Sequence, residues 1–325
     1  YLKYYLTTMA PGRITGGAGA SSGGAICVEN NGTLNFNSGK IDGNQYAVNG
    51  GAIYAIDSTL NINDGLFIEN YASNVGGAIY VNNCLVNIKN AKIIDNSSAK
   101  GGGGVYAINS QLNIDYIIVH ANFVRTNQAK AGGMWLKNST TTIVDCEIMS
   151  NSSDFDGGGL FVDATNAETT SKLTLEDGTF SKNFAQNGAG IYICSYASCI
   201  IDNAKISNNK ADSCAAGLFV FQLAECVVNN ANISNNVITK PSDHLTSGAG
   251  VCIGNGGTLT INGGLIENNY IESNYIPEGS TKPYSDAGSG IGMFDNKIVG
   301  VPTTLYLNGG TVTNNKSFYY GAGVF

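Results

Sequence analysis

Side chains suited to acid–base catalysis are few and scattered in this sequence. Asp154 and Asp156 form the closest acidic pair, and their alternate spacing would place both carboxylates on one side of an extended loop. Hydrolysis of a glycosidic bond needs two carboxyl groups facing each other across the substrate, and no second acidic cluster occurs at matching positions. The two histidines, His120 and His244, stand alone. We therefore expect no catalytic residues, and a polysaccharide lyase or hydrolase is kept only as an alternative.

The eight cysteines carry no metal-ligand spacing such as Cys-x-x-Cys, so we expect neither a metal nor another cofactor. Cys199 and Cys226 are one candidate disulfide pair, because they occupy the same position in successive repeats. Cys194 with Cys214 is a second candidate. Disulfide bonding and simple packing as small apolar side chains are both compatible with the sequence.

These residues belong to a repeat that fills most of the chain. Its most regular part is the run Gly50-Gly51-Ala52-Ile53-Tyr54, which recurs with a basic period near 26 residues, lengthened in places by insertions. A fixed period of this size indicates a solenoid. The aliphatic position of the run is occupied, in order, by Ile26, Ile53, Ile79, Val105, Met134, Leu160, Ile191, Leu218, Val251, Ile291 and Val324.

Between copies of this run, apolar residues alternate with polar ones, as in Leu60-Asn61-Ile62, and a further apolar residue such as Phe67 follows a turn. Alternation over a few residues indicates strands. The pattern predicts three short strands per period, separated by turns rich in Gly, Asn and Asp. Coils of this kind stack at the strand spacing of about 4.8 Å and bury their apolar side against their neighbours. We expect an all-β fold, a parallel β-helix of about ten coils.

An asparagine follows every copy of the third strand. A carboxamide tolerates unusual turn conformations and can bond both its own coil and the neighbouring one. Stacked at one position, these side chains are expected to form an inward-facing structural ladder along the solenoid. Its members are Asn44, Asn70, Asn96, Asn122, Asn151, Asn183, Asn209, Asn236, Asn269 and Asn315.

The runs Gly50-Gly51-Ala52-Ile53 and Phe67-Ile68-Glu69-Asn70 fit the patterns GGAI and FxxN, which recur at 76–79 and 180–183. With them, the chain from residue 23 onward resembles the repeat of the chlamydial polymorphic outer membrane proteins. The resemblance implies a right-handed parallel β-helix of the type used in surface-exposed adhesin passengers. Later copies depart from GGAI toward GAG, AAG and GSG.

In the strand that contains Tyr54, the residues on either side of the tyrosine are expected to face inward, so the tyrosine position faces outward. Aromatic side chains stacked outside every coil would form a stripe much larger than isolated exposed apolar residues. The stripe is interpreted as self-packing that stabilises the sheet, as a track for stacking saccharides, or as a subunit interface, which we favour. Its aromatic members are Tyr54, Tyr80, Tyr106, Trp135, Phe161, Tyr192 and Phe219.

Composition excludes several classes of partner. The formal net charge is −7 and the chain has only two arginines, whereas nucleic-acid binding needs a basic surface. No apolar run is long enough to be a transmembrane segment. Residues 23–325 are expected to form one domain behind a lead-in segment or partial coil at 1–22. Because the sequence starts without Met and stops inside a repeat, we expect a piece of a longer chain or a fibre, with more solenoid or another subunit covering its ends.

Two further surface features are expected. Sequons place possible N-linked glycans at Asn31, Asn138 and Asn232, which should point outward. The connections at 237–247 and 270–287 are much longer than the others and follow each other in the solenoid. They are therefore candidates for ligand or subunit contacts.

Together these features predict a non-enzymatic extracellular or cell-surface protein that works through its shape and surface. We favour a structural subunit of a surface filament or coat, with self-association or continuation of the same solenoid as its partner interaction. The alternative, which follows from the repeat resemblance, is an adhesin or passenger that binds host or glycan surfaces. No nucleic acid and no cofactor is expected to take part.

Overall fold

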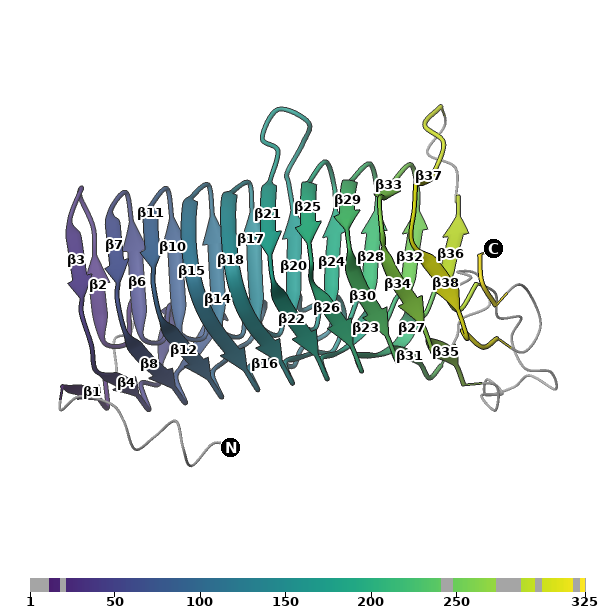
Figure 1. The fold of residues 1–325 in the computed structure, drawn as a ribbon. Helices are drawn as coiled ribbons and strands as arrows, with labels where there is room; N and C mark the ends of the chain where they lie inside the picture. The colour runs from purple at the N-terminus through teal and green to yellow at the C-terminus, as the bar shows by residue number, and fades with distance from the viewer. Residues whose placement is uncertain are drawn as a thin grey trace.

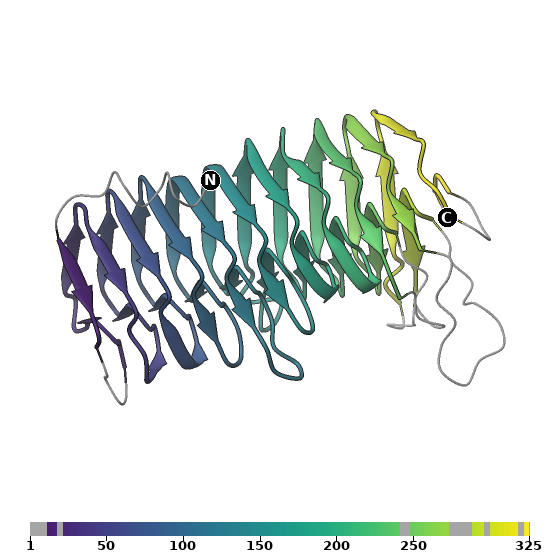
Figure 2. The same cartoon turned by 90° about the horizontal axis from the view of Figure 1, so that it is seen from below.

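The computed structural model describes residues 12–17, 22–240, 248–272, 288–295, 300–317 and 322–324. In these residues the chain contains strands and turns but no helix, and every strand pairs in parallel with the equivalent strands of neighbouring coils. The coils follow one another along a single axis (Figure 1, Figure 2). The expected all-β parallel β-helix is therefore confirmed. Within the same residues no helix could cross a bilayer.

One strand of each coil belongs to a ten-stranded sheet, sheet B, which carries the aliphatic position of the repeat. Ile53 pairs with Ile79, and Ile79 with Val105, so equivalent residues stack in register. Alternate residues of a strand point to opposite faces, and Ile53 is fully buried whereas Tyr54 is half-buried. Sheet B consists of β2 (Ile26–Val28), β6 (Ile53–Ile56), β10 (Ile79–Asn82), β14 (Val105–Ile108), β17 (Met134–Lys137), β20 (Leu160–Asp163), β24 (Ile191–Cys194), β28 (Leu218–Phe221), β32 (Val251–Gly254) and β36 (Ile291–Phe294).

The other predicted strands form sheet A, which covers two faces of each coil. Most coils contribute two strands separated by a turn, but β15 (Gln111–His120) and β18 (Thr140–Met149) run across both faces without a break. These two long strands join the two columns into one nineteen-stranded sheet. Its other members are β1 (Arg13–Thr15), β3 (Thr33–Phe36), β4 (Lys40–Asp42), β7 (Thr59–Ile62), β8 (Gly65–Ile68), β11 (Leu85–Ile88), β12 (Ala91–Ile94), β21 (Lys172–Glu176), β22 (Gly178–Ser181), β25 (Ser198–Asp202), β26 (Lys205–Ser207), β29 (Glu225–Asn229), β30 (Ala231–Ser234), β33 (Thr258–Ile261), β34 (Gly264–Glu267), β37 (Thr304–Leu307) and β38 (Thr311–Thr313).

A fourth strand, which the sequence pattern did not indicate, follows the asparagine of most coils and belongs to sheet C. These strands are short, several of them only two residues long. Inserted residues form loops at the turns that connect one sheet to the next. Figure 1 shows this for the loop between β20 and β21, which projects beyond the turns of the neighbouring coils. Sheet C consists of β5 (Ala47–Asn49), β9 (Tyr71–Val75), β13 (Ser97–Ser98), β16 (Phe123–Val124), β19 (Ser152–Ser153), β23 (Phe184–Asn187), β27 (Lys210–Cys214), β31 (Val237–Ile238) and β35 (Tyr270–Ile271).

The interior of the coils is one continuous apolar core. Phe67 and Phe180, from the third predicted strand, are fully buried and pack among the aliphatic residues of sheets A and B. A Cβ added at Gly65 or Gly178 would come within 3 Å of the ring two residues later. A residue of minimal size two positions before each phenylalanine therefore makes room for its ring.

The last two residues before the aliphatic position of sheet B carry at most one Cβ between them in each described coil. The three residues before the aliphatic position read Gly50-Gly51-Ala52 and Gly76-Gly77-Ala78 in early coils but Gly188-Ala189-Gly190 in a later one. A Cβ added at Gly77 would come within 2.5 Å of the Ser97 carbonyl oxygen and closer still to that of Gly103. In no described coil do the second and third positions both carry a Cβ. The later departures from GGAI thus keep the total volume of the turn small.

A serine ladder runs along the turn after sheet B. The Ser110 hydroxyl donates to the Ile108 carbonyl oxygen at 2.7 Å and accepts the backbone N–H of Cys84 at 3.1 Å. Ser139 makes the equivalent two contacts one coil further on. Cys84 stands in the same column, where its thiol contacts the Asn82 carbonyl oxygen. The ladder therefore links neighbouring coils through buried hydroxyls.

We expect Ser110→Ala to lower the free energy of unfolding by about 1–2 kcal/mol, because two hydrogen bonds are lost and the buried Cys84 N–H loses its acceptor. Cys84→Ser is the matched control: a hydroxyl already fits this column in neighbouring coils, so the change should stay within about 0.5 kcal/mol. Guanidinium unfolding followed by circular dichroism measures both. Equal effects of the two substitutions would show that the ladder does not stabilise the turn.

Candidate functional site

The predicted asparagine column forms a buried hydrogen-bonded ladder. In a typical rung, the Asn122 Nδ2 donates to the Asn151 Oδ1 at 3.0 Å and to the Ile93 carbonyl oxygen at 2.8 Å. The Asn122 Oδ1 accepts hydrogen bonds from the backbone N–H and the Nδ2 of Asn96. This uses both donors and both acceptor positions of the carboxamide. An interior rung is thus fully satisfied by three coils of the protein, and we assign the ladder a structural role.

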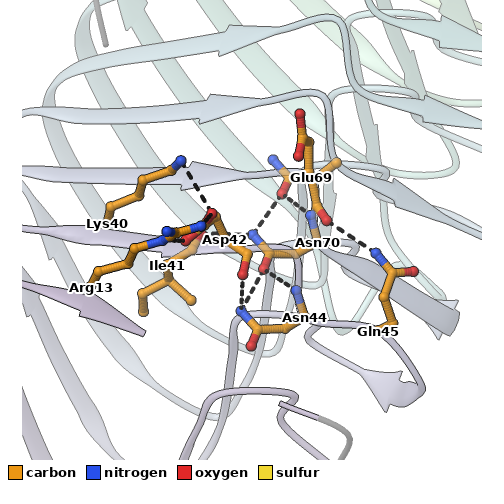
Figure 3. Close-up of polar contacts among 9 residues, drawn as sticks. Arg13, Lys40, Ile41, Asp42, Asn44, Gln45, Glu69 and Asn70 are labelled. Carbon is orange, nitrogen blue, oxygen red and sulfur yellow. Dashed lines mark hydrogen bonds and ion pairs between the residues drawn. The ribbon is translucent and has the colours of Figure 1, made fainter. Parts of the chain in front are cut away.

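The first rungs of this ladder lie beside a group of charged side chains (Figure 3). Asp42 is almost fully buried; it accepts a hydrogen bond of 2.7 Å from the Arg13 Nε and lies 3.1 Å from the Lys40 Nζ. The hydrogen bond from Arg13 is the main reason why the carboxyl pKa of Asp42 is lowered. Next to it, the Asn44 Nδ2 donates to the Asn70 Oδ1 at 2.8 Å. The ion pair ties β1 to β4, so we assign it a structural role as well.

The aromatic column of sheet B runs outside the coils, but its two halves have different surroundings. Tyr54 and Tyr80 stack with their ring centroids 5.1 Å apart and remain half-buried. Tyr106 is already buried, with 9% exposure, and Phe161, Tyr192 and Phe219 are buried further, with 5% exposure or less. The second half is therefore not the exposed stripe that the sequence predicts, and its rings are not available to a saccharide or a subunit.

The corner between sheets B and C explains this burial. Residues at the ends of the sheet C strands and in the turns that follow pack against the outer side of the aromatic column, so the rings form a second small apolar core outside the coils. Trp135 and Phe221 pack against its edge. We call this group the corner cluster. It consists of Ala131, Phe161, Tyr192, Cys194, Cys214, Ala215, Phe219 and Cys252.

In the first half of the solenoid the same corner is open and forms a cleft of about 730 Å³, which we call the corner groove. Tyr80, Tyr106 and Trp135 line it as an aromatic wall. The Tyr80 and Tyr106 rings are nearly parallel with centroids 5.7 Å apart, and Trp135 meets Tyr106 edge-on at 5.0 Å. Gly101 provides space here, because a Cβ at this position would overlap the Trp135 ring. The volume is in the range of small-molecule binding sites.

Amide side chains also line the corner groove. The Asn74 Nδ2 donates to the Asn49 Oδ1 at 2.8 Å, so a short amide ladder borders the cleft. The turn at 126–129, after β16, contributes further lining residues. The sequence pattern did not indicate any of these residues. The available signal was the spacing of 29 residues between Asn122 and Asn151, which marks an insertion at this turn.

Charged side chains lie at the boundary between the corner groove and the corner cluster. Asp163, buried with 7% exposure, accepts a hydrogen bond of 2.6 Å from the Trp135 Nε1. The Lys130 Nζ lies 4.8 Å from the centroid of the Phe161 ring, a cation–π contact. Burial raises the carboxyl pKa of Asp163, and the hydrogen bond from Trp135 opposes this shift. These contacts hold the indole in one orientation at the end of the aromatic wall.

We expect Asp163→Asn to stabilise the protein at neutral pH, because the amide keeps an acceptor for Trp135 and removes a carboxyl that ionises in an apolar site. The folded protein binds the proton of Asp163 more tightly than the unfolded chain does. Its contribution to stability therefore falls as the pH rises from the ordinary pKa of about 4 through the raised folded pKa.

Asp42→Asn is the matched control and should act in the opposite direction. The carboxyl pKa of Asp42 is lowered in the folded protein, so its stabilisation is present above the ordinary pKa and is lost as the pH falls through the folded pKa. Thermal unfolding at several pH values from about 2 to 7 measures both variants, with the Asp42 contribution lost below about pH 4 and the Asp163 contribution lost above it. A less stable Asp163→Asn protein at neutral pH would contradict the prediction.

The two carboxylates considered for catalysis do not share one side of their loop. Asp154 is exposed, whereas Asp156 is buried and accepts a hydrogen bond of 3.0 Å from the Asn187 Nδ2. The expected common side is therefore wrong, because Asp156 forms backbone bridges that hold it at the corner. His120 ends β15 in sheet A, and His244 lies outside the described residues. Across the described part of the chain, no group of three His, Cys, Asp or Glu side chains is placed to hold a metal ion.

The cysteines include a close pair that the sequence did not indicate. Cys199 and Cys226 are in-register neighbours in β25 and β29, and both are buried in the coil interior. Cys194 and Cys214 both belong to the corner cluster. However, the Sγ of Cys214 lies 3.3 Å from that of Cys252. Cys214 is the last residue of a sheet C strand. The sequence pattern predicted only the three strands of sheets A and B, so it did not predict the position of Cys214.

The remaining predicted surface features are placed as follows. Asn31 is exposed in a turn. The Asn138 carboxamide donates to the Thr165 Oγ1 at 3.0 Å and accepts the Thr165 N–H at 2.8 Å, and Asn232 is half-buried in β30. Asn31 is therefore the sequon best placed for a glycan. The long connections at 237–247 and 270–287 fall largely outside the described residues.

The fold and the groove define this chain as a parallel β-helix repeat protein with an aromatic and amide-lined cleft on the outside of its coils. Comparison with known protein families, with curated proteins and with solved structures finds no match for it. Because one fold serves many functions, the function must be argued from the groove.

Proposed function

We propose that this chain is a non-enzymatic, extracellular β-helix protein that binds glycans in the corner groove. The observation that carries the proposal is the open half of the aromatic column, where Tyr80, Tyr106 and Trp135 face a cleft of about 730 Å³. In the other half the same column is covered by side chains of the protein itself. An aromatic column that only stabilised sheet B would not require this opening, which favours a ligand site.

A saccharide fits the chemistry of the groove. The C–H face of a sugar ring packs on aromatic rings, and sugar hydroxyls pair with amides that both donate and accept hydrogen bonds. The ring centroids repeat at 5.1 and 5.7 Å along the solenoid, about the length of one sugar unit in a linear chain. Burial raises the pKa of Tyr80 and Tyr106, so both phenols stay protonated and neutral. These features favour a linear oligosaccharide, and Lys100, which also lines the groove, would pair with an acidic group on it.

The repeat supports the same assignment. The GGAI and FxxN runs resemble the chlamydial polymorphic outer membrane protein repeat, which implies a passenger of the adhesin type. An adhesin acts outside the cell and uses its surface rather than a catalytic centre. Glycan recognition along the outside of the coils is in keeping with that role.

We expect Trp135→Ala to weaken glycan binding by about tenfold or more, because it removes the end of the aromatic wall and a buried aromatic anchor typically contributes more than about 1 kcal/mol. The wild-type protein is first screened on an array of neutral and acidic oligosaccharides, and the best ligand is then titrated by calorimetry. If the folded protein binds nothing on the array, the proposal fails.

Tyr306→Ala is the control for this measurement. Tyr306 is also an aromatic residue on a strand, and it is 54% exposed, but it lies in β37 at the other end of the solenoid. Its removal should leave binding unchanged. Circular dichroism confirms that each variant is folded. Equal loss of binding in both variants would indicate adhesion to exposed aromatic rings in general instead of a site in the groove.

A second candidate is the filament or coat subunit. Leu307, which pairs with the buried Ile261 of the preceding coil, is 48% exposed. Leu307 and the apolar column to which it belongs are exposed at this coil. Packing of a further coil against them, from the same polypeptide or from another copy, would bury these side chains and stabilise the column. Electron microscopy of native material tests this candidate. Ordered fibres with an axial repeat of about 50 Å would support it, and monodisperse particles would oppose it.

A further inference from the structure

We propose that Cys214 and Cys252 form a disulfide bond that ties two successive coils together outside the coil interior. The proposal is independent of glycan binding. The two Sγ atoms lie 3.3 Å apart, and both residues are fully buried in the corner cluster. A disulfide has a sulfur–sulfur distance of about 2.05 Å. The two sulfurs must therefore approach each other by about 1.3 Å to reach bonding distance.

The backbone positions explain why these two sulfurs meet. Cys214 ends β27 in sheet C, whereas Cys252 occupies the outward position of β32 in sheet B, next to Phe219 of β28. Their side chains reach the corner cluster from two different sheets. Cys199 and Cys226 are instead in-register neighbours on parallel strands. Their thiols also contact each other, but in-register side chains on parallel strands are about one strand spacing, ~4.8 Å, apart at Cβ, whereas a disulfide typically has about 3.8 Å.

The bond would stabilise a coil that carries a long insertion. The two cysteines are 38 residues apart, and the sheet C strand between them, β31, contains only Val237–Ile238. In the described part of this coil, strand pairing in sheet C is limited to these two residues, with backbone hydrogen bonds from Thr239 and Lys240 beyond them. A cross-link that closes a loop of this length stabilises the folded state by restricting the unfolded chain.

Formation of the bond requires an oxidant, for which a small-molecule disulfide such as oxidised glutathione is sufficient. One cysteine thiolate attacks the glutathione disulfide and releases one reduced glutathione, and the other cysteine sulfur then displaces the second glutathione from the mixed disulfide. Two protein thiols are oxidised to one disulfide, and the glutathione disulfide is reduced to two thiols, which take up the two protons. Burial raises the pKa of the Cys214 thiol, so the exchange takes place before the coil has closed.

The test is refolding of the full chain after complete reduction and unfolding. One sample is refolded with reduced and oxidised glutathione, and the other with a phosphine reductant. Alkylation under denaturing conditions and peptide mass mapping should show Cys214 joined to Cys252 in the first sample, with every other cysteine alkylated. The thermal midpoint of the first sample should be higher by about 5 °C.

Variants control for the origin of this shift. Cys214→Ala and Cys252→Ala should each abolish the difference between the two samples, whereas Cys27→Ala, at an exposed position, should preserve it. If the alanine variants do not refold, the peptide map of the wild-type protein alone decides. Alkylation of both Cys214 and Cys252, or a bond from either of them to Cys194, would overturn the proposal.

Discussion

Asn122→Ala is expected to lower the free energy of unfolding by about 3–5 kcal/mol. The substitution removes two hydrogen bonds that the carboxamide donates and two that it accepts. It also leaves the buried backbone N–H of Asn96 without its acceptor, in a place that water does not reach, whereas the Asn96 Nδ2 keeps the Phe67 and Ile94 carbonyl oxygens as acceptors. Guanidinium unfolding followed by circular dichroism measures the loss.

Asn113→Ala in the same coil is the matched control. Asn113 also belongs to a column of carboxamides, and its Nδ2 donates to the Asn87 Oδ1 at 2.9 Å, but this column is exposed on the outside of sheet A. Water replaces the lost hydrogen bond there, so the expected loss is below about 1 kcal/mol. Losses of similar size for Asn113→Ala and Asn122→Ala would mean that burial is not what makes the inner ladder strong.

Gly77→Ala is expected to lower the free energy of unfolding by about 3 kcal/mol. The added methyl group would meet the carbonyl oxygens of Ser97 and Gly103, and neither can move away without breaking the backbone hydrogen bonds that join the coils. The turn already carries the methyl group of Ala78, which is fully buried. Thermal unfolding and guanidinium unfolding both report the effect.

The double substitution Gly77→Ala/Ala78→Gly should recover most of this loss, because glycine at 78 lets the turn backbone shift and move the new methyl group away from the two carbonyl oxygens. It produces the arrangement of Gly188-Ala189-Gly190, in which the single methyl group stands at the second position instead of the third. Ala78→Gly alone should destabilise by about 1 kcal/mol, because glycine has more conformational freedom in the unfolded chain. A double variant as unstable as the sum of its parts would show that the two positions do not share one space.

The fold could be predicted because each column of the repeat has one chemical character. Ile53, Phe67 and Asn70 each stand for a column of aliphatic, apolar or carboxamide side chains, and parallel in-register stacking satisfies all of these columns at once. The strands of sheet C could not be predicted in this way. Ser97–Ser98 pairs with Phe123–Val124, which shares no side-chain character with it. Backbone hydrogen bonds between coils, which depend little on residue type, determine these strands.

The candidate site could be predicted only in part. The repeat correctly places Tyr80, Tyr106 and Trp135 outside the coils, since their neighbours in the strand face inward. Whether an outward ring is exposed depends on the sheet C side of the corner. On that side, Gly101 and Cys214 occupy equivalent positions of different coils. The residues at this position share no chemical character from coil to coil. Burial of the rings in the second half therefore had no counterpart in the sequence pattern.

The asparagine ladder has a direction along the solenoid. From rung to rung, each Nδ2 donates to the Oδ1 on its C-terminal side, as Asn44 does to Asn70 and Asn269 does to Asn315, whereas the Asn44 Oδ1 accepts from the Gly17 N–H on the N-terminal side. A coil stacked beyond the last rung must therefore offer an acceptor, and a coil stacked before the first rung must offer a donor. Two copies related by a two-fold axis at one end would oppose donor to donor or acceptor to acceptor. A head-to-tail stack of copies would instead continue the ladder from one copy to the next.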